Sequence, residues 1–222
     1  MQQSINNEFA FTFIDLFAGI GGLRLAFEND DVKGKCVFTS ENNTFAVKTY
    51  KANFPGSDVH GDITDIKAED IPDHDVLLAG FPCQPFSHAG KKQGFEHPTQ
   101  GTLFDDILRI IQKKKPHVFV LENVKGLKSH DKGNTYRIIL DELRKAGYYT
   151  QTEILDGQYY VPQHRERTVI VGFKRPNIPF NLDKRDYISD KKPILKDILL
   201  SETEVDDKYT LSDHLWDYLK KR

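Results

Sequence analysis

Phe-Thr-Phe-Ile-Asp-Leu-Phe-Ala-Gly-Ile-Gly-Gly, residues 11–22, is the segment that best indicates how this chain folds. Residues 11–17 are apolar and aromatic around Asp15, which is typical of a buried strand. A glycine-rich turn follows, and residues 23–28 then favour a helix. This order predicts a site where backbone approaches a nucleotide-like ligand near a helix N-terminus. The glycine spacing matches neither a dinucleotide fingerprint nor a phosphate-binding loop, so a tight turn packed under a helix is the alternative.

Strand-like and helix-like segments alternate outward from this turn. Further strands are expected at 35–40, 59–63, 75–79, 116–121, 148–155 and 168–173, and helices at 44–53, 103–112 and 134–145. The alternation predicts a doubly wound α/β fold, with a mostly parallel sheet of about seven strands and an antiparallel last strand.

The pattern changes after residue 175, where prolines and charged residues become frequent and no sheet-forming run appears. We therefore expect one ligand-binding domain over residues 11–175. A linker with short helices at 193–200 and 212–220 is expected over residues 176–222.

Acids follow several of the predicted strands, at the sheet edge where open α/β folds bind ligands. Glu41 comes ~20 residues after the glycine turn, where an acid accepts hydrogen bonds from ribose hydroxyls. The alternative for Glu41 is a helix N-terminal acid that favours the helix dipole. Asp62 is placed to meet an exocyclic amine, and a simple turn aspartate is its alternative. Glu122 ends the predicted strand at 116–121.

Cys83 lies in Gly-Phe-Pro-Cys-Gln-Pro-Phe-Ser, residues 80–87, which follows the predicted strand at 75–79. Prolines on both sides fix φ near −65° and favour extended neighbours, so we expect a stiff loop. A buried, inert cysteine is the alternative. The loop continues to Gly101, a length that is usually functional and often forms a lid. Arg165 and Arg167 precede the last strand and would favour a thiolate if they reach the same edge.

The composition bounds the class of protein. The chain has 222 residues, 38% apolar and 29% charged, with a formal net charge of −2. Two cysteines argue for a reducing cytoplasm and against a disulfide framework or a metal cluster. No apolar run approaches the ~20 residues of a membrane helix, and the polar start is no secretory signal. We expect a cytoplasmic protein with no metal and no membrane partner.

With these residues in hand, the chain resembles the cytosine-C5 DNA methyltransferase family. Five segments carry the resemblance, in the family's order, over residues 11–173. They are Asp15-Leu-Phe-Ala-Gly-Ile-Gly-Gly22, Gly61-Asp-Ile63, Gly80-Phe-Pro-Cys-Gln84, Glu122-Asn-Val124 and Gln163-His-Arg-Glu-Arg167. The resemblance implies a Rossmann-like, S-adenosylmethionine-dependent methyltransferase domain.

The resemblance also implies which residues bind the S-adenosylmethionine donor. Glu41 would hold the ribose hydroxyls, Asp62 the adenine amine, and Ile63 would lie against the ring. The other implied donor contacts are Phe17, Gly19, Gly21, Gly22, Pro82 and Leu103. One departure is visible at Asn42, where some members place an aromatic or apolar residue over the adenine; this puts a stacking contact in doubt.

For catalysis, the resemblance implies attack of the Cys83 thiolate on carbon 6 of a cytosine flipped out of double-stranded DNA. Glu122 would bind the base at N3 and its exocyclic amine, and Arg165 would hold its carbonyl oxygen. Arg167 would brace the loop. The implied contacts to the DNA substrate are Gln84, Ser87, Lys91, Lys92 and Gln163.

The family continues after the last strand with a variable DNA-reading region and a returning segment that contains Gly-Asn-Ser. Neither is present in these 222 residues. The resemblance implies an enzyme of a restriction-modification system, and three explanations for the missing part remain open: a truncation, one half of a split enzyme, and a reduced non-catalytic relative. Two other classes are a tRNA cytosine methyltransferase and a module that binds donor or DNA without turnover. A thiol hydrolase is disfavoured, because neither His88 nor His164 has a motif around it.

Overall fold

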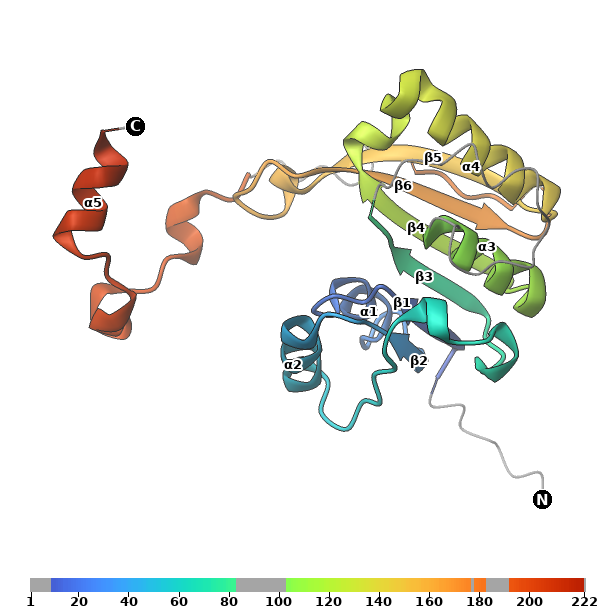
Figure 1. Cartoon of the computed structure of the whole chain (residues 1–222), viewed down its shortest axis with the longest axis horizontal. Helices are drawn as coiled ribbons and strands as arrows, with labels where there is room; N and C mark the ends of the chain where they lie inside the picture. The colour runs from blue at the N-terminus through green and yellow to red at the C-terminus, as the bar shows by residue number, and fades with distance from the viewer. Residues whose placement is uncertain (1–8, 83–102, 177, 183–191, 222) are drawn as a thin grey trace. The chain divides into compact units, whose positions relative to one another are not determined.

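The computed structural model describes residues 9–82, 103–176, 178–182 and 192–221. Within these residues, six strands form one sheet in the order β2-β1-β3-β4-β6-β5 (Figure 1). The strand bounds are β1 Phe11–Leu16, β2 Gly34–Ser40, β3 Val76–Gly80, β4 Val118–Val124, β5 Tyr149–Asp156 and β6 Glu166–Phe173. The main helices are α1 Gly22–Phe27, α2 Thr44–Asn53, α3 Leu103–Lys114 and α4 Asn134–Lys145.

The strand directions confirm the predicted doubly wound, mostly parallel sheet. Strand β1 pairs in parallel with β2 and β3, and β3 pairs in parallel with β4. Strand β6 pairs with β4 antiparallel, as expected for the last strand. The carboxyl ends of β1, β2, β3 and β4 therefore meet at one edge of the sheet.

The strand expected at 59–63 is wrong, which leaves six strands rather than about seven. Only His60 pairs with the sheet, through an isolated parallel bridge to Ser40. Two residues later the Asp62 side chain accepts a hydrogen bond from the Thr64 backbone and begins a 3-10 turn, Ile63–Asp65. A side chain that satisfies its own backbone in this way competes with a strand ladder.

Both faces of the sheet are covered, because alternate strand residues point to opposite sides. Phe13 and Leu78 face Leu23 and Phe27 of α1. The opposite face is the larger core, in which α3 and α4 lie side by side (Figure 1). Its fully buried members include Ile14, Leu77, Ile107, Phe119, Ile139 and Leu143.

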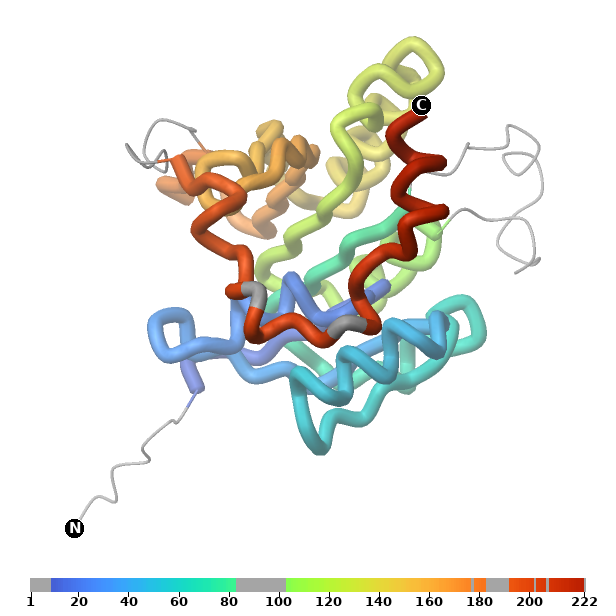
Figure 2. Tube along the Cα trace, turned by 90° about the vertical axis from the view of Figure 1, so that its left-hand side faces the viewer, coloured from blue at the N-terminus to red at the C-terminus, as the bar shows by residue number. Residues whose placement is uncertain are grey.

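The sheet and α1–α4 make one compact unit, and a second unit includes residues 156–165 and 192–221. Helix α5, Asp213–Lys220, lies in the C-terminal stretch drawn in red in Figure 2 and fits the helix expected at 212–220. The helix expected at 193–200 is only a 3-10 turn, Leu195–Ile198, and the Ile194 backbone N–H donates to the Asp197 side chain at its start. In the described part of the chain, no helix has the length and apolar character needed to span a bilayer.

Candidate active site

The glycine turn after β1 has a backbone that few side chains tolerate. Phe17 adopts a left-handed conformation with φ 54° directly after the strand. Gly21 has φ 93°, and a Cβ there would lie 2.2 Å from the Phe54 ring at the end of α2. The Gly21 N–H donates to the Ala18 carbonyl at 2.9 Å and closes the turn. Glycine is therefore needed at Gly21 for both conformation and space.

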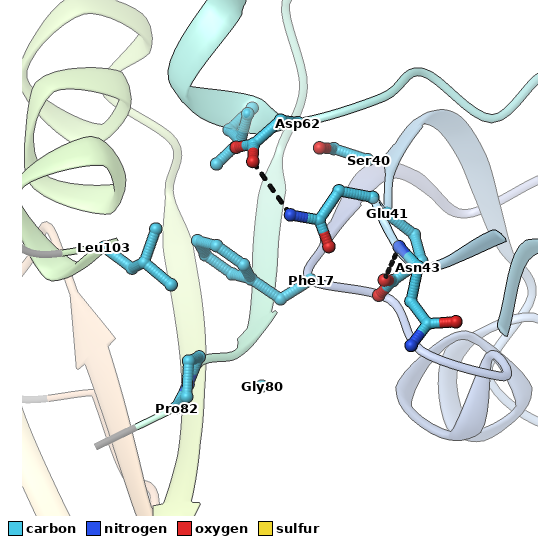
Figure 3. A pocket seen from close by; sticks show the side chains of 10 residues that line it. Phe17, Ser40, Glu41, Asn43, Asp62, Gly80, Pro82 and Leu103 are labelled. Atoms are coloured by element: carbon cyan, nitrogen blue, oxygen red, sulfur yellow. Dashed lines mark hydrogen bonds between the residues drawn. The ribbon is translucent and has the colours of Figure 1, made fainter. Parts of the chain in front are cut away.

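Glu41 joins this turn to the second strand. It follows β2 directly, and its Oε2 accepts a hydrogen bond from the Gly19 backbone N–H at 2.8 Å. Its Oε1 accepts from the Asn43 backbone N–H at 2.7 Å (Figure 3). The carboxylate is thus held by two backbone donors, while its remaining lone pairs stay available to hydroxyl groups of a ligand.

Asp62 is the second acid at this edge. Its Oδ1 accepts from the Thr64 backbone N–H at 3.0 Å and from the Thr64 hydroxyl at 2.9 Å. Its Oδ2 accepts from the Asn42 amide at 2.8 Å, which is the dashed line at Asp62 in Figure 3. The Thr64 N–H and then the Asn42 amide lower the pKa of Asp62, so its carboxylate is ionised and acts as an acceptor.

A cavity of about 320 Å³ opens between these acids and the ends of β1 and β3. This volume is within the ~300–1,000 Å³ of typical small-molecule sites. Apolar side chains of Phe17, Ile63 and Leu103 line it together with the acceptors on Glu41 and Asp62. Figure 3 shows Phe17 between Leu103 and Glu41. The full lining is Phe17, Ser40, Glu41, Asn42, Asn43, Asp62, Ile63, Gly80, Pro82 and Leu103.

The glycines expected to contact a donor do not belong to this lining. Gly19 acts through its N–H on Glu41, and Gly21 shapes the turn against Phe54. Gly22 begins α1 and is exposed. These glycines therefore lie in the turn next to the acids and do not line the cavity.

A second group of side chains lies beside the cavity, on β4 and β6. Glu122 is paired in register with Gly80, and its Oε2 lies 3.5 Å from where a Gly80 Cβ would be. Its Oε1 lies 2.8 Å from Nε of Arg167. Arg167 faces the end of β4 because it pairs with Val124 across the antiparallel ladder. From the sequence we expected Arg167 to brace its loop, and we did not predict its ion pair with Glu122.

The backbone that leads into the cysteine loop is anchored by Asn123. This residue is buried, and its amide donates to the Phe81 carbonyl at 2.8 Å. Pro82 follows and lines the cavity. Cys83, Gln84, Ser87, Lys91 and Lys92 lie outside the described residues.

Arg165 and Gln163 belong to the second unit, and both are exposed. The loop that carries them is organised by Asp156, whose Oδ1 accepts from the Arg165 backbone N–H at 3.0 Å. The other oxygen of Asp156 lies 2.7 Å from Nδ1 of His164. Arg165 is thus fixed within its own loop.

Comparisons with known proteins identify the family. A family model described as C-5 cytosine-specific DNA methylase matches residues 11–222. The chain belongs to this family. It is 52% identical, over 96% of its length, to the type II methyltransferase M.NlaX of Neisseria lactamica, of which it covers 66%. It is 46% identical, over 95% of its length, to a DNA-cytosine methyltransferase of Escherichia coli K12, of which it covers 52%.

A solved structure supports the same family. A mutant of DNMT2 from Spodoptera frugiperda superposes with a TM-score of 0.71 at 25% identity, covering 94% of this chain and 65% of that one. The chain thus spans about half to two-thirds of the length of the relatives that it matches. Membership implies S-adenosylmethionine as the methyl donor. The cavity fits this donor, because its acids suit hydroxyls and an amine while its apolar side chains suit a ring.

Sequence reasoning about this family member missed several residues. Asn123 stands inside the Glu-Asn-Val motif, yet its role as an anchor depends on the proximity of Phe81, which no local pattern encodes. Ser40, Asn42 and Asn43 line the cavity because they continue from β2 on either side of Glu41. Of these three residues, Asn42 could have been assigned to the cavity from the sequence, because it directly follows Glu41.

Proposed function

We propose that this chain is the catalytic part of a DNA (cytosine-5)-methyltransferase of a cytoplasmic restriction-modification system. It transfers a methyl group from S-adenosylmethionine to carbon 5 of a flipped cytosine. The observation that carries the proposal is the ion pair between Glu122 and Arg167, held on neighbouring strands beside the donor cavity. The same strand anchors the backbone that leads to Cys83.

On the donor side, Glu41 accepts from the ribose hydroxyls and Asp62 from the adenine amine. Phe17, Ile63, Pro82 and Leu103 enclose the apolar parts of the molecule, and Gly19, Gly21 and Gly22 keep the turn open to it. When bound, the donor supplies an electrophilic methyl group on sulfur. The chain's task is to orient that group toward the base and to exclude water.

On the base side, Cys83 makes carbon 5 nucleophilic. Its thiolate forms a bond to carbon 6 of the cytosine, and the electron pair displaced from the 5,6 double bond makes carbon 5 nucleophilic. Carbon 5 attacks the methyl carbon, the bond from that carbon to the donor's sulfur breaks, and S-adenosylhomocysteine leaves with the bonding pair. The proton on carbon 5 then leaves to a base, its bonding pair restores the double bond, and the thiolate is expelled. Cysteine, the reactive thiol, is regenerated unchanged.

Glu122 stabilises the base while this adduct forms. It binds N3 and the exocyclic amine, where charge changes as the thiolate adds. Arg167 holds the carboxylate in place from the next strand. Arg165 binds the carbonyl oxygen, and Gln84, Ser87, Lys91, Lys92 and Gln163 contact the DNA around the flipped nucleotide.

Recognition of the target sequence comes from protein outside this chain, on a following segment or a second polypeptide. The share of the relatives that the chain spans supports this, since half to a third of each relative has no counterpart here. Helix α5 supports it too, because all of its residues are exposed, including Leu215, Trp216 and Leu219. Base-edge contacts that specify a sequence would come from that additional part.

The test is a covalent trap on duplex DNA that contains 5-fluorocytosine, with the C-terminal part of a close relative added to the chain. Fluorine on carbon 5 cannot leave as a proton does, so the bond from sulfur to carbon 6 persists after methyl transfer. The parent chain is expected to form a denaturant-stable adduct with labelled methyl, and Cys83→Ser to form none. Cys36→Ser serves as the matched control and keeps the adduct.

Binding of S-adenosylmethionine to Cys83→Ser, measured by calorimetry, is expected to stay within about twofold of the parent, because a hydroxyl replaces the thiol with little change of shape. Normal turnover by Cys83→Ser would refute the covalent route. A parent chain that binds the donor but never forms the adduct would reveal a donor-binding module instead.

A further inference from the structure

Asn42 lies between the two acids of the donor cavity, at a position that the proposed function leaves without a role. It follows Glu41, which is fixed by the backbone of Gly19 and Asn43. It is exposed and lines the cavity. Its amide nitrogen donates to Oδ2 of Asp62 at 2.8 Å, across from the end of β2 to the turn that begins at Ile63.

The two carboxylate oxygens of Asp62 accept hydrogen bonds from different partners. Thr64 occupies Oδ1 twice, through its N–H and its hydroxyl. A carboxylate oxygen offers about two lone-pair sites, so Oδ1 is filled and Oδ2 keeps one site beyond the bond from Asn42. Among the described residues, Thr64 on one oxygen and Asn42 on the other therefore set the acceptor direction that stays open at Asp62.

The Asn42 backbone cannot follow a shift of Asp62 freely. Its two neighbours are tied to each other, since the Asn43 N–H donates to the Glu41 side chain. Asn43 also caps α2 by accepting bonds from the N–H groups of Phe45 and Ala46. The amide thus projects from a fixed point. A side chain in such a position holds its partner in one orientation at a small entropic cost.

We propose that Asn42 is a positioning residue that orients Asp62 to read the exocyclic amine of the donor's adenine. The inference rests on the proposed function, because it takes adenine as the group that enters the cavity. In this arrangement the polar side chain of Asn42 occupies the place next to the adenine ring. The preference for an amine over a carbonyl oxygen then comes from the hydrogen-bonded pair of Asn42 and Asp62. A hypoxanthine ring, which presents a carbonyl oxygen to the carboxylate, is rejected.

The experiment measures binding to the chain alone by calorimetry, so that it needs neither DNA nor turnover. The two probes are S-adenosylhomocysteine and S-inosylhomocysteine, which differ at the position that Asp62 would read. Asn42→Ala removes the donor to Asp62. Asn134→Ala is the matched control, because it removes the same kind of amide, which there donates to Asp131 at the start of α4 and not to a residue of the cavity.

The parent is expected to bind S-adenosylhomocysteine more tightly than S-inosylhomocysteine. Asn42→Ala is expected to lose about three- to tenfold in affinity for the adenine compound, the effect of one hydrogen bond, with less than about twofold change for the inosine compound. Asn134→Ala is expected to change neither. Asp62→Ala is expected to abolish the preference between the two.

Three results would overturn the inference: an equal loss for both probes, no loss for either, or tighter binding of the adenine compound by Asn42→Ala. The last would mean that Asn42 competes with adenine for Asp62. The proposed donor site fails separately, if Asp62→Ala keeps the preference or if the parent binds neither probe. In that case the contact between Asn42 and Asp62 serves only the free protein.

Discussion

The donor side and the base side of the site are built in different ways. On the donor side, Glu41 and Asp62 are fixed by backbone donors within a few residues along the chain or in the adjoining turn. On the base side, Glu122 and Arg167 are joined across a strand pair by residues far apart in sequence. The groups proposed to complete the base side lie on the cysteine loop and in the second unit.

The difference teaches that donor binding and catalysis can be separated in this chain. The donor cavity is lined by residues of one compact unit, so we expect the chain to bind S-adenosylmethionine by itself. The proposed base-side chemistry also uses Cys83 and Arg165, and we expect turnover, unlike donor binding, to require DNA and a target-recognition part. The predictions below test that separation.

The largest effect is expected from Glu122→Gln. The amide keeps the shape but loses the charge that the base-side chemistry uses, so methyl transfer should fall about 10²–10³-fold. Calorimetry should show donor affinity within about twofold of the parent, as the cavity acids are untouched. Glu166→Gln, which removes a carboxylate paired with Lys125 at 2.6 Å on an exposed face, is the control and should keep its activity. A parallel loss of donor binding would show that the two sides are not separable.

A smaller effect, confined to the donor side and the fold, is expected from Gly21→Ala. Its Cβ would collide with the Phe54 ring, and its φ of 93° would be strained. Overpacking of this kind lowers the free energy of unfolding by about 1–3 kcal/mol. Urea denaturation measures this, and donor affinity should fall along with it, because the turn holds Gly19 against Glu41.

Gly22→Ala is the matched control for this substitution. No atom lies within 4 Å of a Cβ at Gly22, and its φ is not in the left-handed region. Alanine there should leave the urea midpoint unchanged or slightly raised, since alanine favours a helix. Equal destabilisation by both substitutions would argue against the contact with Phe54.

The smallest effect on donor binding and catalysis is expected at Asp15, in the middle of β1, where the change falls on stability. It is fully buried, and neither carboxylate oxygen has a hydrogen-bond partner among the described residues. Burial raises its pKa from 3.8 to about 7, against an opposing attraction by Arg24. The folded state thus holds a proton that the unfolded chain releases near pH 4, so stability falls as the pH rises from about 4 to about 7.

Asp15→Asn removes this loss. The variant is expected to gain stability over the parent as the pH rises, with a gain about 2–3 kcal/mol larger at pH 8 than at pH 5. Urea unfolding at the two pH values measures it, and donor affinity at pH 8 should stay within a few-fold of the parent. A gain of the same size at both pH values would show that Asp15 does not hold a proton in the folded state.

Much of the fold follows from local pattern. The apolar run at 11–17, the glycine turn and the helix after it appear where the sequence predicts them, and the alternation fixes the parallel sheet. The strand expected at 59–63 failed because a single apolar-polar alternation does not reveal that Asp62 will cap its own turn. The sequence likewise shows apolar residues at 193–200 but not that Asp197 folds back onto Ile194.

The site was harder to predict than the fold, because its contacts depend on strand order. Glu41 could be placed from its position directly after β2, which is local, and Asp62 lines the same cavity although it caps a 3-10 turn where a strand was expected. The pair between Glu122 and Arg167 requires β6 to insert between β4 and β5, and no motif specifies that register. The same holds for Asn123, whose partner is 42 residues away.

The bond from Asn123 to the Phe81 carbonyl has a mechanical consequence. It ties Phe81, two residues before Cys83 in the sequence, to the strand that presents Glu122. A movement of β4 that lifts Glu122 must therefore carry the Phe81 backbone with it. We expect the point from which the chain leaves toward the proposed nucleophile to travel together with the proposed acid.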